Sequence, residues 1–137
     1  MLEYLRITNE GTLPDINRLK PYKSVVVVET NISSDRQAEI SRWLVGSGCL
    51  YMMAWGRECS SWDNSVDFAN LEEFSYGEIP DDAFVMTTWH ESEPLEEVFW
   101  FAKNSAFHPS IELDNTLILH LGENDKSEEF KNQFKNA

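Results

Sequence analysis

The stretch Ser24–Thr30 (SVVVVET) decides the fold, because it places four consecutive valines, Val25 to Val28, between polar residues. A run of β-branched residues without alternation of apolar and polar positions is typical of a strand that is covered on both faces. We therefore predict that this stretch forms a central strand of a parallel sheet.

A helix and a second strand are expected next along the chain. Ser34 is followed three residues later by Gln37, which is the capping-box spacing at a helix start. Ile40 and Leu44 continue one helical face, and residues 49–55 (CLYMMAW) form a second apolar run. Strand, helix and strand within about 30 residues indicate a βαβ unit with a right-handed crossover.

The rest of the chain continues this alternation. Apolar runs predict strands at residues 83–89 and 116–121, and a weaker signal at residues 2–7 suggests an edge strand. Helices are expected around residues 66–74, capped by Asn64 or Ser65, over residues 94–106 and from Ser127 onward. Residues 1–137 are thus predicted to form a single α/β domain, a three-layer sandwich with a mostly parallel sheet of about four strands. With the four stronger strands numbered along the chain, the preferred order is 2-1-3-4, which keeps the valine strand inside.

Charge is distributed unevenly along the chain. The formal net charge is −13, from 24 acidic and 11 basic residues. Residues 58–114 contain fourteen of the acidic residues and one basic residue, Lys103. The segments on either side are within one charge of neutral. Residues 58–114, named here the acidic segment, therefore carry the whole imbalance.

This imbalance disfavours some classes of partner and favours another. A protein that binds bare nucleic acid needs Lys and Arg to replace counterions, and anionic lipid surfaces also attract bases. A basic protein surface would instead be attracted to the acidic segment, although carboxylates also serve solubility alone. Tryptophan is enriched in binding hot spots. The predicted partner-binding residues are Glu58, Trp62, Asp63, Asp67, Glu72, Glu73, Trp89, Glu93, Glu96 and Glu97.

A separate candidate site lies at the ends of the predicted strands. In open α/β sheets, ligands bind beyond the carboxyl ends of the strands, where the strand order reverses. With the preferred order, Glu29, His90 and Glu91 flank this point and Cys59 lies nearby. Cys59 as nucleophile and His90 as base, assisted by Glu29 or Glu91, would suit a hydrolase. A buried structural thiol is the other interpretation of Cys59.

Metal and cofactor sites are not predicted. Cys59, His90 and His120 could supply three zinc ligands, but none belongs to a close pair such as HxxxH or CxxC. Carboxylates that could hold magnesium are Glu29, Glu58, Asp63 and Glu91. No glycine-rich phosphate-binding motif is present, so we expect no nucleotide cofactor.

Three motifs carry a resemblance to a known family. The segment Trp55–Asp67 (WGRECSSWDNSVD), with TTWHE at residues 87–91 and EEVFWF at residues 96–101, resembles an uncharacterised family of small bacterial α/β proteins. The likeness covers most of residues 24–122 and implies no catalytic residue. In type, a small acidic chain of this kind is also similar to immunity proteins that block basic toxin domains.

Two functions follow from these observations. The preferred one is an acidic protein-binding module that neutralises a basic partner such as a nuclease toxin, as an immunity or inhibitor protein does. The alternative is a small hydrolase-like enzyme with its site at the carboxyl ends of the strands. Since no apolar run approaches about 18 residues and no signal-peptide pattern follows Met1, we expect a cytoplasmic protein.

Overall fold

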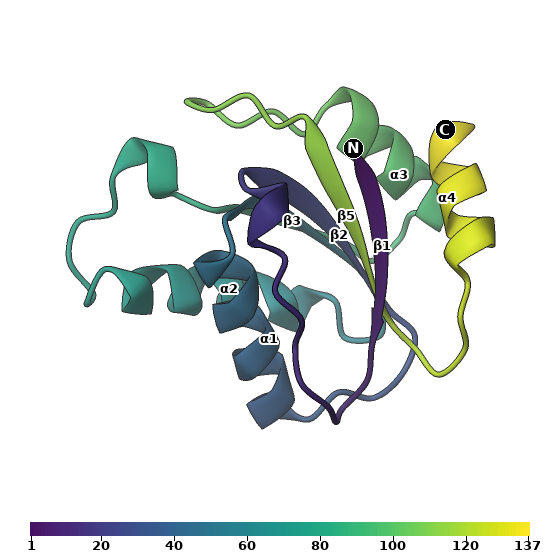
Figure 1. The fold of residues 1–137 in the computed structure, drawn as a ribbon, viewed down its shortest axis with the longest axis horizontal. Coiled ribbons are helices and arrows are strands. Elements are labelled where there is room, and N and C mark those ends of the chain that lie inside the picture. The colour runs from purple at the N-terminus through teal and green to yellow at the C-terminus, as the bar shows by residue number, and fades with distance from the viewer.

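A five-stranded parallel sheet is the middle layer of the computed structural model, which describes residues 1–137 (Figure 1). The strands are β1 (Leu2–Ile7), β2 (Tyr22–Val28), β3 (Cys49–Gly56), β4 (Met86–His90) and β5 (Asn115–Leu121). The helices are α1 (Ser34–Gly46), α2 (Ser60–Glu73), α3 (Leu95–Asn104) and α4 (Ser127–Lys135), with single 3-10 turns η1 (Asn17–Leu19) and η2 (Asp81–Ala83). The predicted α/β class and parallel sheet are confirmed.

The valine strand β2 is central and is buried along its whole length, as predicted. Val26 and Val28 pack in a core cluster with residues of α1 and α2, whereas Val25 and Val27 pack in a second cluster with residues of α3 and α4. Helices therefore cover both faces of the sheet, and the absence of alternation in the sequence reflects two apolar environments.

The strand order differs from the prediction. The sheet has five strands in the order β1-β5-β2-β3-β4, because residues 2–7 form a full edge strand that pairs with β5. The predicted order 2-1-3-4 placed residues 49–55 and residues 83–89 on the two sides of the valine strand. β3 does lie beside β2, but the neighbour on the other side is β5, and β4 is at the sheet edge. The chain moves in one direction from β2 through β3 to β4. It then returns through α3 to place β5 on the other side of β2.

Several element starts also differ from the predictions. The cap of α1 is Ser33, whose hydroxyl accepts from the Arg36 N–H at 3.2 Å, rather than Ser34. The α2 helix begins at Ser60, before the predicted caps Asn64 and Ser65, and β4 begins at Met86. None of the helices is long and apolar enough to cross a membrane.

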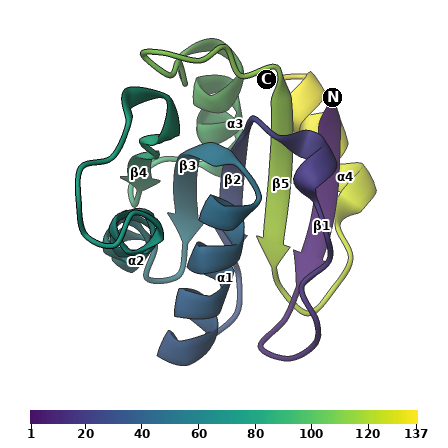
Figure 2. The ribbon, with the colours of Figure 1, turned by 60° about the vertical axis from the view of Figure 1, so that its left-hand side comes forward.

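Figure 2 shows how this order places the two edges of the sheet. The β4 edge has α2 beside it, and β1 forms the opposite edge. All five strands are parallel, so their carboxyl ends meet along one end of the sheet. The strand order reverses between β2 and β5, and this is where a ligand site of an open α/β sheet is expected.

Candidate functional site

Glu29 and His120 meet at the point where the strand order reverses. Glu29 directly follows β2, and His120 is near the end of the neighbouring strand β5. Nε2 of His120 lies 2.6 Å from Oε1 of Glu29, and its Nδ1 lies 2.6 Å from the hydroxyl of Tyr4. The imidazole is buried, so both of its nitrogens are satisfied inside the protein.

The partners of Tyr4 indicate which imidazole nitrogen carries the hydrogen. The backbone N–H of Lys126 donates to the Tyr4 hydroxyl at 3.0 Å. That hydroxyl can then donate to Nδ1 of His120, while Nε2–H of the ring donates to Glu29. The Lys126 ammonium donates to the second carboxylate oxygen of Glu29 at 3.1 Å. We name Tyr4, Glu29, His120 and Lys126 the carboxyl-edge cluster.

The carboxyl-edge cluster holds an ionised carboxylate beside a small hollow. Burial alone would raise the pKa of Glu29, but the hydrogen bonds from His120 and Lys126 and the charge of Lys126 outweigh it and lower the pKa. Burial raises the pKa of the Tyr4 hydroxyl. The hollow has a volume of about 380 Å³. Its lining residues are Glu29, Thr30, Arg57, Glu123, Asn124 and Lys126.

The structure places the Cys59 and His90 side chains of the predicted hydrolase site on opposite faces of the sheet. Cys59 is buried in the core cluster under α1 and α2, whereas the His90 ring packs against Phe101 of α3, on the opposite face of the sheet. Burial raises the pKa of the Cys59 thiol. Both His90 nitrogens are occupied, by Glu93 at 2.9 Å and by Thr88 at 3.0 Å. The buried structural thiol is thus the interpretation of Cys59 that the geometry supports.

Glu29 has a different neighbour from the one expected, and the three candidate zinc ligands lie apart. Because β3 lies between β2 and β4, Glu29 meets His120 rather than His90 or Glu91. Cys59, His90 and His120 do not converge, and no three His, Cys, Asp or Glu side chains are grouped as metal ligands. Glu29 is therefore the carboxylate that meets an imidazole where the strand order reverses.

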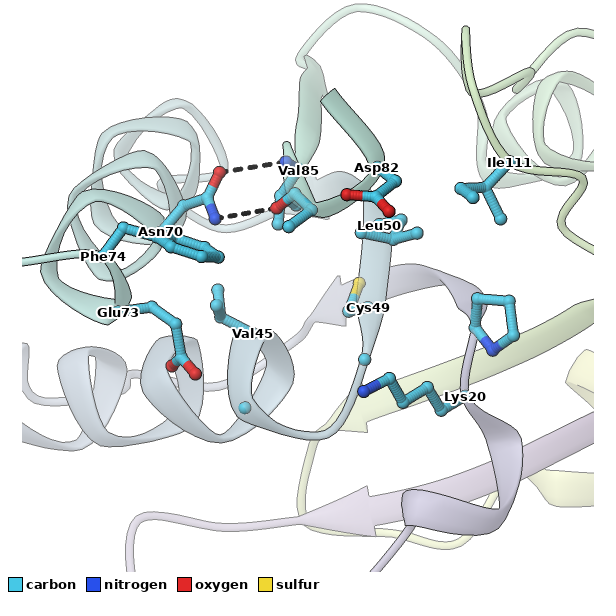
Figure 3. A pocket seen from close by; sticks show the side chains of 14 residues that line it. Lys20, Val45, Cys49, Leu50, Asn70, Glu73, Phe74, Asp82, Val85 and Ile111 are labelled. Atoms are coloured by element: carbon cyan, nitrogen blue, oxygen red, sulfur yellow. Dashed lines mark hydrogen bonds between the residues drawn. The ribbon is translucent and has the colours of Figure 1, made fainter. Parts of the chain in front are cut away.

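A second cavity, of about 410 Å³, opens at the amino ends of the strands (Figure 3). Val45, Leu50, Phe74 and other apolar side chains line it, together with polar side chains such as Asn70. The Asn70 amide donates to the Ala83 carbonyl at 3.1 Å and accepts from the Val85 N–H at 3.0 Å. This amide holds the chain before β4 against α2, which is a structural role.

The acidic segment comprises α2, η2, β4, α3 and their connections, so it contributes to the helix layers on both faces of the sheet as well as to the β4 edge. Among its fourteen carboxylates, only Glu93 has an ion-pair partner, His90. The ammonium of Lys103, its single base, donates to the carbonyls of Lys135 and Ala137. The exposed members of the predicted binding set are Glu58, Glu73, Trp89, Glu93, Glu96 and Glu97, and Asp63, Asp67 and Glu72 are half-buried.

Trp62 does not belong to this surface. Its side chain is 2% exposed and packs in the core cluster with α1, whereas Trp89 is 46% exposed. Trp62, Val66 and Ala69 lie at i, i+4 and i+7 of α2, which forms a buried stripe. Trp62 therefore belongs to the core rather than to the exposed surface, because α2 begins four residues before its expected cap.

Among the exposed apolar side chains of the acidic segment, the sequence predicted only Trp89 as a binding residue. Large apolar side chains that remain exposed in the acidic segment are Phe68, Leu71, Tyr76, Phe84, Trp89, Trp100 and Phe107. Outside the acidic segment, Met1 is the one large apolar side chain that is exposed. Tyr4 and Lys126 of the carboxyl-edge cluster were missed as well, since their meeting depends on the position of β1 beside β5.

Comparison with known proteins identifies a family whose description states no activity. A protein-family model described as a domain of unknown function matches residues 2–137. No curated protein matches the chain, and no solved structure matches it.

Proposed function

We propose a function from the structure itself, because the chain belongs to the family Domain of unknown function (DUF7684), whose description assigns none. The protein is an acidic binding module that attaches to a basic protein partner and neutralises it. A nuclease toxin domain is the kind of partner that fits, and the module then acts as an immunity or inhibitor protein. The observation that carries this proposal is the coincidence of unpaired carboxylates and exposed aromatic rings in one segment.

The carboxylates supply the electrostatic part of the interaction. Thirteen of the fourteen in the acidic segment lack an ion-pair partner within the chain. Charges left unpaired on a surface attract an opposite surface and accelerate encounter, with an effect that falls as salt rises. A basic protein is the partner that this surface favours, because phosphate backbones and anionic lipids carry the same sign of charge.

The exposed rings supply the apolar part. Trp89 and Trp100 are 46% and 52% exposed, and Phe107 is 74% exposed. Exposed tryptophans are enriched at interaction sites, where tryptophan carries much of the binding energy. A surface that only kept the protein in solution would need the carboxylates but not the rings.

Affinity capture with the immobilised full chain tests the proposal. Bound proteins are identified by mass spectrometry at about 0.05 M and about 0.5 M salt, and the complex is then rebuilt from purified components. The informative variant is the double charge reversal Glu96→Lys and Glu97→Lys, with Glu128→Lys and Glu129→Lys as the matched control. Each pair lies in the first turn of a helix, so both variants lose the same helix-dipole stabilisation.

The proposal predicts a difference between these variants. The reversal on α3 abolishes capture of a basic partner, and the reversal on α4 leaves it intact. Co-expression of a captured partner with the wild-type chain relieves any toxicity of that partner. Equal capture by both variants would contradict the proposal.

A second candidate function is a hydrolase-like enzyme, favoured by the position of Glu29 and His120 where the strand order reverses. Glu29 borders the 380 Å³ hollow, and the buried His120 orients its carboxylate. Hydrolysis of ester or phosphoester substrates that is lost in Glu29→Gln but retained in Cys59→Ala would support this candidate. Equal rates in Glu29→Gln and wild type on every substrate found would dismiss it.

A further inference from the structure

The outer edge of β4 has no strand partner. β4 pairs with β3 alone and is the last strand of the sheet on this side (Figure 2). An edge strand presents a row of unpaired N–H and C=O groups that can pair with another chain. Natural edges are commonly blunted by Lys or Pro, or are covered by a helix or loop. The strand MTTWH contains neither Lys nor Pro, and α2 packs beside it without forming a strand pair with it.

Carboxylates flank this edge on the α2 face of the sheet. The Thr87 hydroxyl donates to the carboxylates of Asp63 and Asp67, with a separation of 3.0 Å to Asp67. Side chains alternate along a strand, so Trp89 lies on the same face as Thr87. Leu71, which is exposed, lies one helical turn beyond Asp67 on the same side of α2.

Carboxylates flank the edge on the α3 face as well. His90 of β4 binds Glu93 at 2.9 Å, and its ring packs 5.2 Å from the ring of Phe101. Glu97 lies one turn before Phe101 on α3, and it therefore faces the same side of that helix. A strand placed alongside β4 would thus have a carboxylate within reach of the side chains on each of its faces.

We propose that the basic partner binds by adding an extended segment, rich in Lys or Arg, to the free edge of β4. This inference rests on the proposed function and specifies how the partner is held. Main-chain hydrogen bonds to β4 supply affinity, and the carboxylates of Asp63, Asp67 and Glu97 select basic side chains. Trp89 supplies the apolar contact.

Charge distinguishes this partner from a second copy of the chain. Pairing of two β4 edges would bring Asp63, Asp67 and Glu97 of both copies together without a base on either side, and like charges at that distance repel. The opposite edge strand, β1, carries Arg6 and lies beside an ion pair between Arg18 and Glu3. The β1 edge lacks the excess of carboxylates, so exchange of its amides serves as the internal control.

Hydrogen–deuterium exchange of the full chain tests the inference with a defined probe. The probe is a synthetic peptide of about seven residues that alternates Lys and Val, used at about 0.01 M salt. A second peptide of the same sequence carries N-methyl groups on alternate amides, which removes donors from one edge and leaves the charge unchanged. Expected results are slower exchange of amides in residues 86–90, unchanged exchange in residues 2–7, and at least about tenfold weaker binding of the methylated peptide.

Each other outcome overturns strand addition. If both peptides bind equally and the β4 amides gain no protection, binding is purely electrostatic; the inference fails while the proposed function stands. Protection of β4 that depends on protein concentration without peptide would identify a second copy as the occupant. If the Lys-containing peptide does not bind at low salt, strand addition is wrong, and the capture experiment alone decides the proposed function.

Discussion

Nε2 of His120 lies 2.6 Å from Oε1 of Glu29, and this contact joins the carboxyl ends of β5 and β2 at the centre of the sheet. The two residues are 91 positions apart in the chain. The contact exists because α3 returns the chain to the far side of β2. It couples the ionisation of Glu29 to the stability of the fold.

The Glu29 carboxylate is expected to stabilise the protein at neutral pH and to lose this effect in acid. His120 and Lys126 lower its pKa against the opposing effect of burial. A group with a lowered pKa in the folded state contributes stability above its unfolded pKa, and the contribution disappears as the pH falls through its folded pKa. We expect Glu29→Gln to lower the free energy of unfolding by about 1 kcal/mol at neutral pH, and by less below about pH 4.

Urea unfolding of wild type and variant across this pH range measures the difference. Glu123→Gln is the matched control, because Glu123 lines the same hollow but has no ion-pair partner. A difference that stayed constant with pH would show that the carboxylate charge is not what stabilises this contact.

Gly122 is expected to be intolerant of a side chain because of the same imidazole. A Cβ atom at Gly122 would clash with Nε2 of His120. The ring is buried and held on both sides, so it cannot move aside without breaking its bond to Glu29. Gly122→Ala should lower the free energy of unfolding by about 2 kcal/mol.

Gly46→Ala provides the comparison for Gly122→Ala. A Cβ at Gly46 meets nothing within 4 Å, and this residue ends α1. Alanine there should be neutral or stabilising by up to about 1 kcal/mol. In thermal unfolding, Gly122→Ala should melt at a lower temperature than Gly46→Ala. Equal melting temperatures would contradict the steric argument.

Both cysteine thiols are expected to be inert in the folded protein. Burial raises the pKa of Cys49 to about 12 and also raises the pKa of Cys59. Because the thiolate is the reactive form, a disulfide reagent at about pH 8 should label neither residue at an appreciable rate until urea unfolds the chain. Single Cys49→Ser and Cys59→Ser variants assign the signal. Fast labelling of native Cys59 would restore it as a candidate nucleophile.

The predictable part of the fold is the part that local sequence determines. Four valines in a row indicate burial on both faces wherever β2 is placed, and that prediction is confirmed. The order of the strands depends on which side of β2 each crossover returns to, and no local pattern carries that information. The Glu29–His120 contact was therefore missed, although each residue was recognised at a strand end.

The misplaced start of α2 also affected which residues were predicted to bind a partner. An N-cap expected at Asn64 or Ser65 left Trp62 outside the helix, where a tryptophan among acids resembles a binding residue. The observed start at Ser60 brings Trp62 into register with Val66 and the core. The exposure of Trp89 depends instead on β4 lying at the sheet edge, which required the strand order.

Asp67 is expected to have opposite effects on stability and on binding. Burial, together with the charge of Asp63, raises the pKa of Asp67. The hydrogen bond from the Thr87 hydroxyl acts in the opposite direction but is outweighed. The ionised form is therefore less favourable in the folded chain than in the unfolded chain. A group with a raised pKa contributes stability below its unfolded pKa and loses that contribution as the pH rises through its folded pKa.

Asp67→Asn should therefore make the protein more stable at neutral pH, by about 0.5 kcal/mol, since the amide cannot ionise and still offers an oxygen to Thr87. The gain should vanish below about pH 4, where the wild-type carboxyl is protonated. Binding of a basic partner should weaken by about 1 kcal/mol, because one carboxylate beside the β4 edge is lost. Chemical unfolding and titration calorimetry on the same variant measure the two effects. A carboxylate that destabilises the free protein is explained by a role in the complex, and a variant that gained stability without losing affinity would remove that explanation.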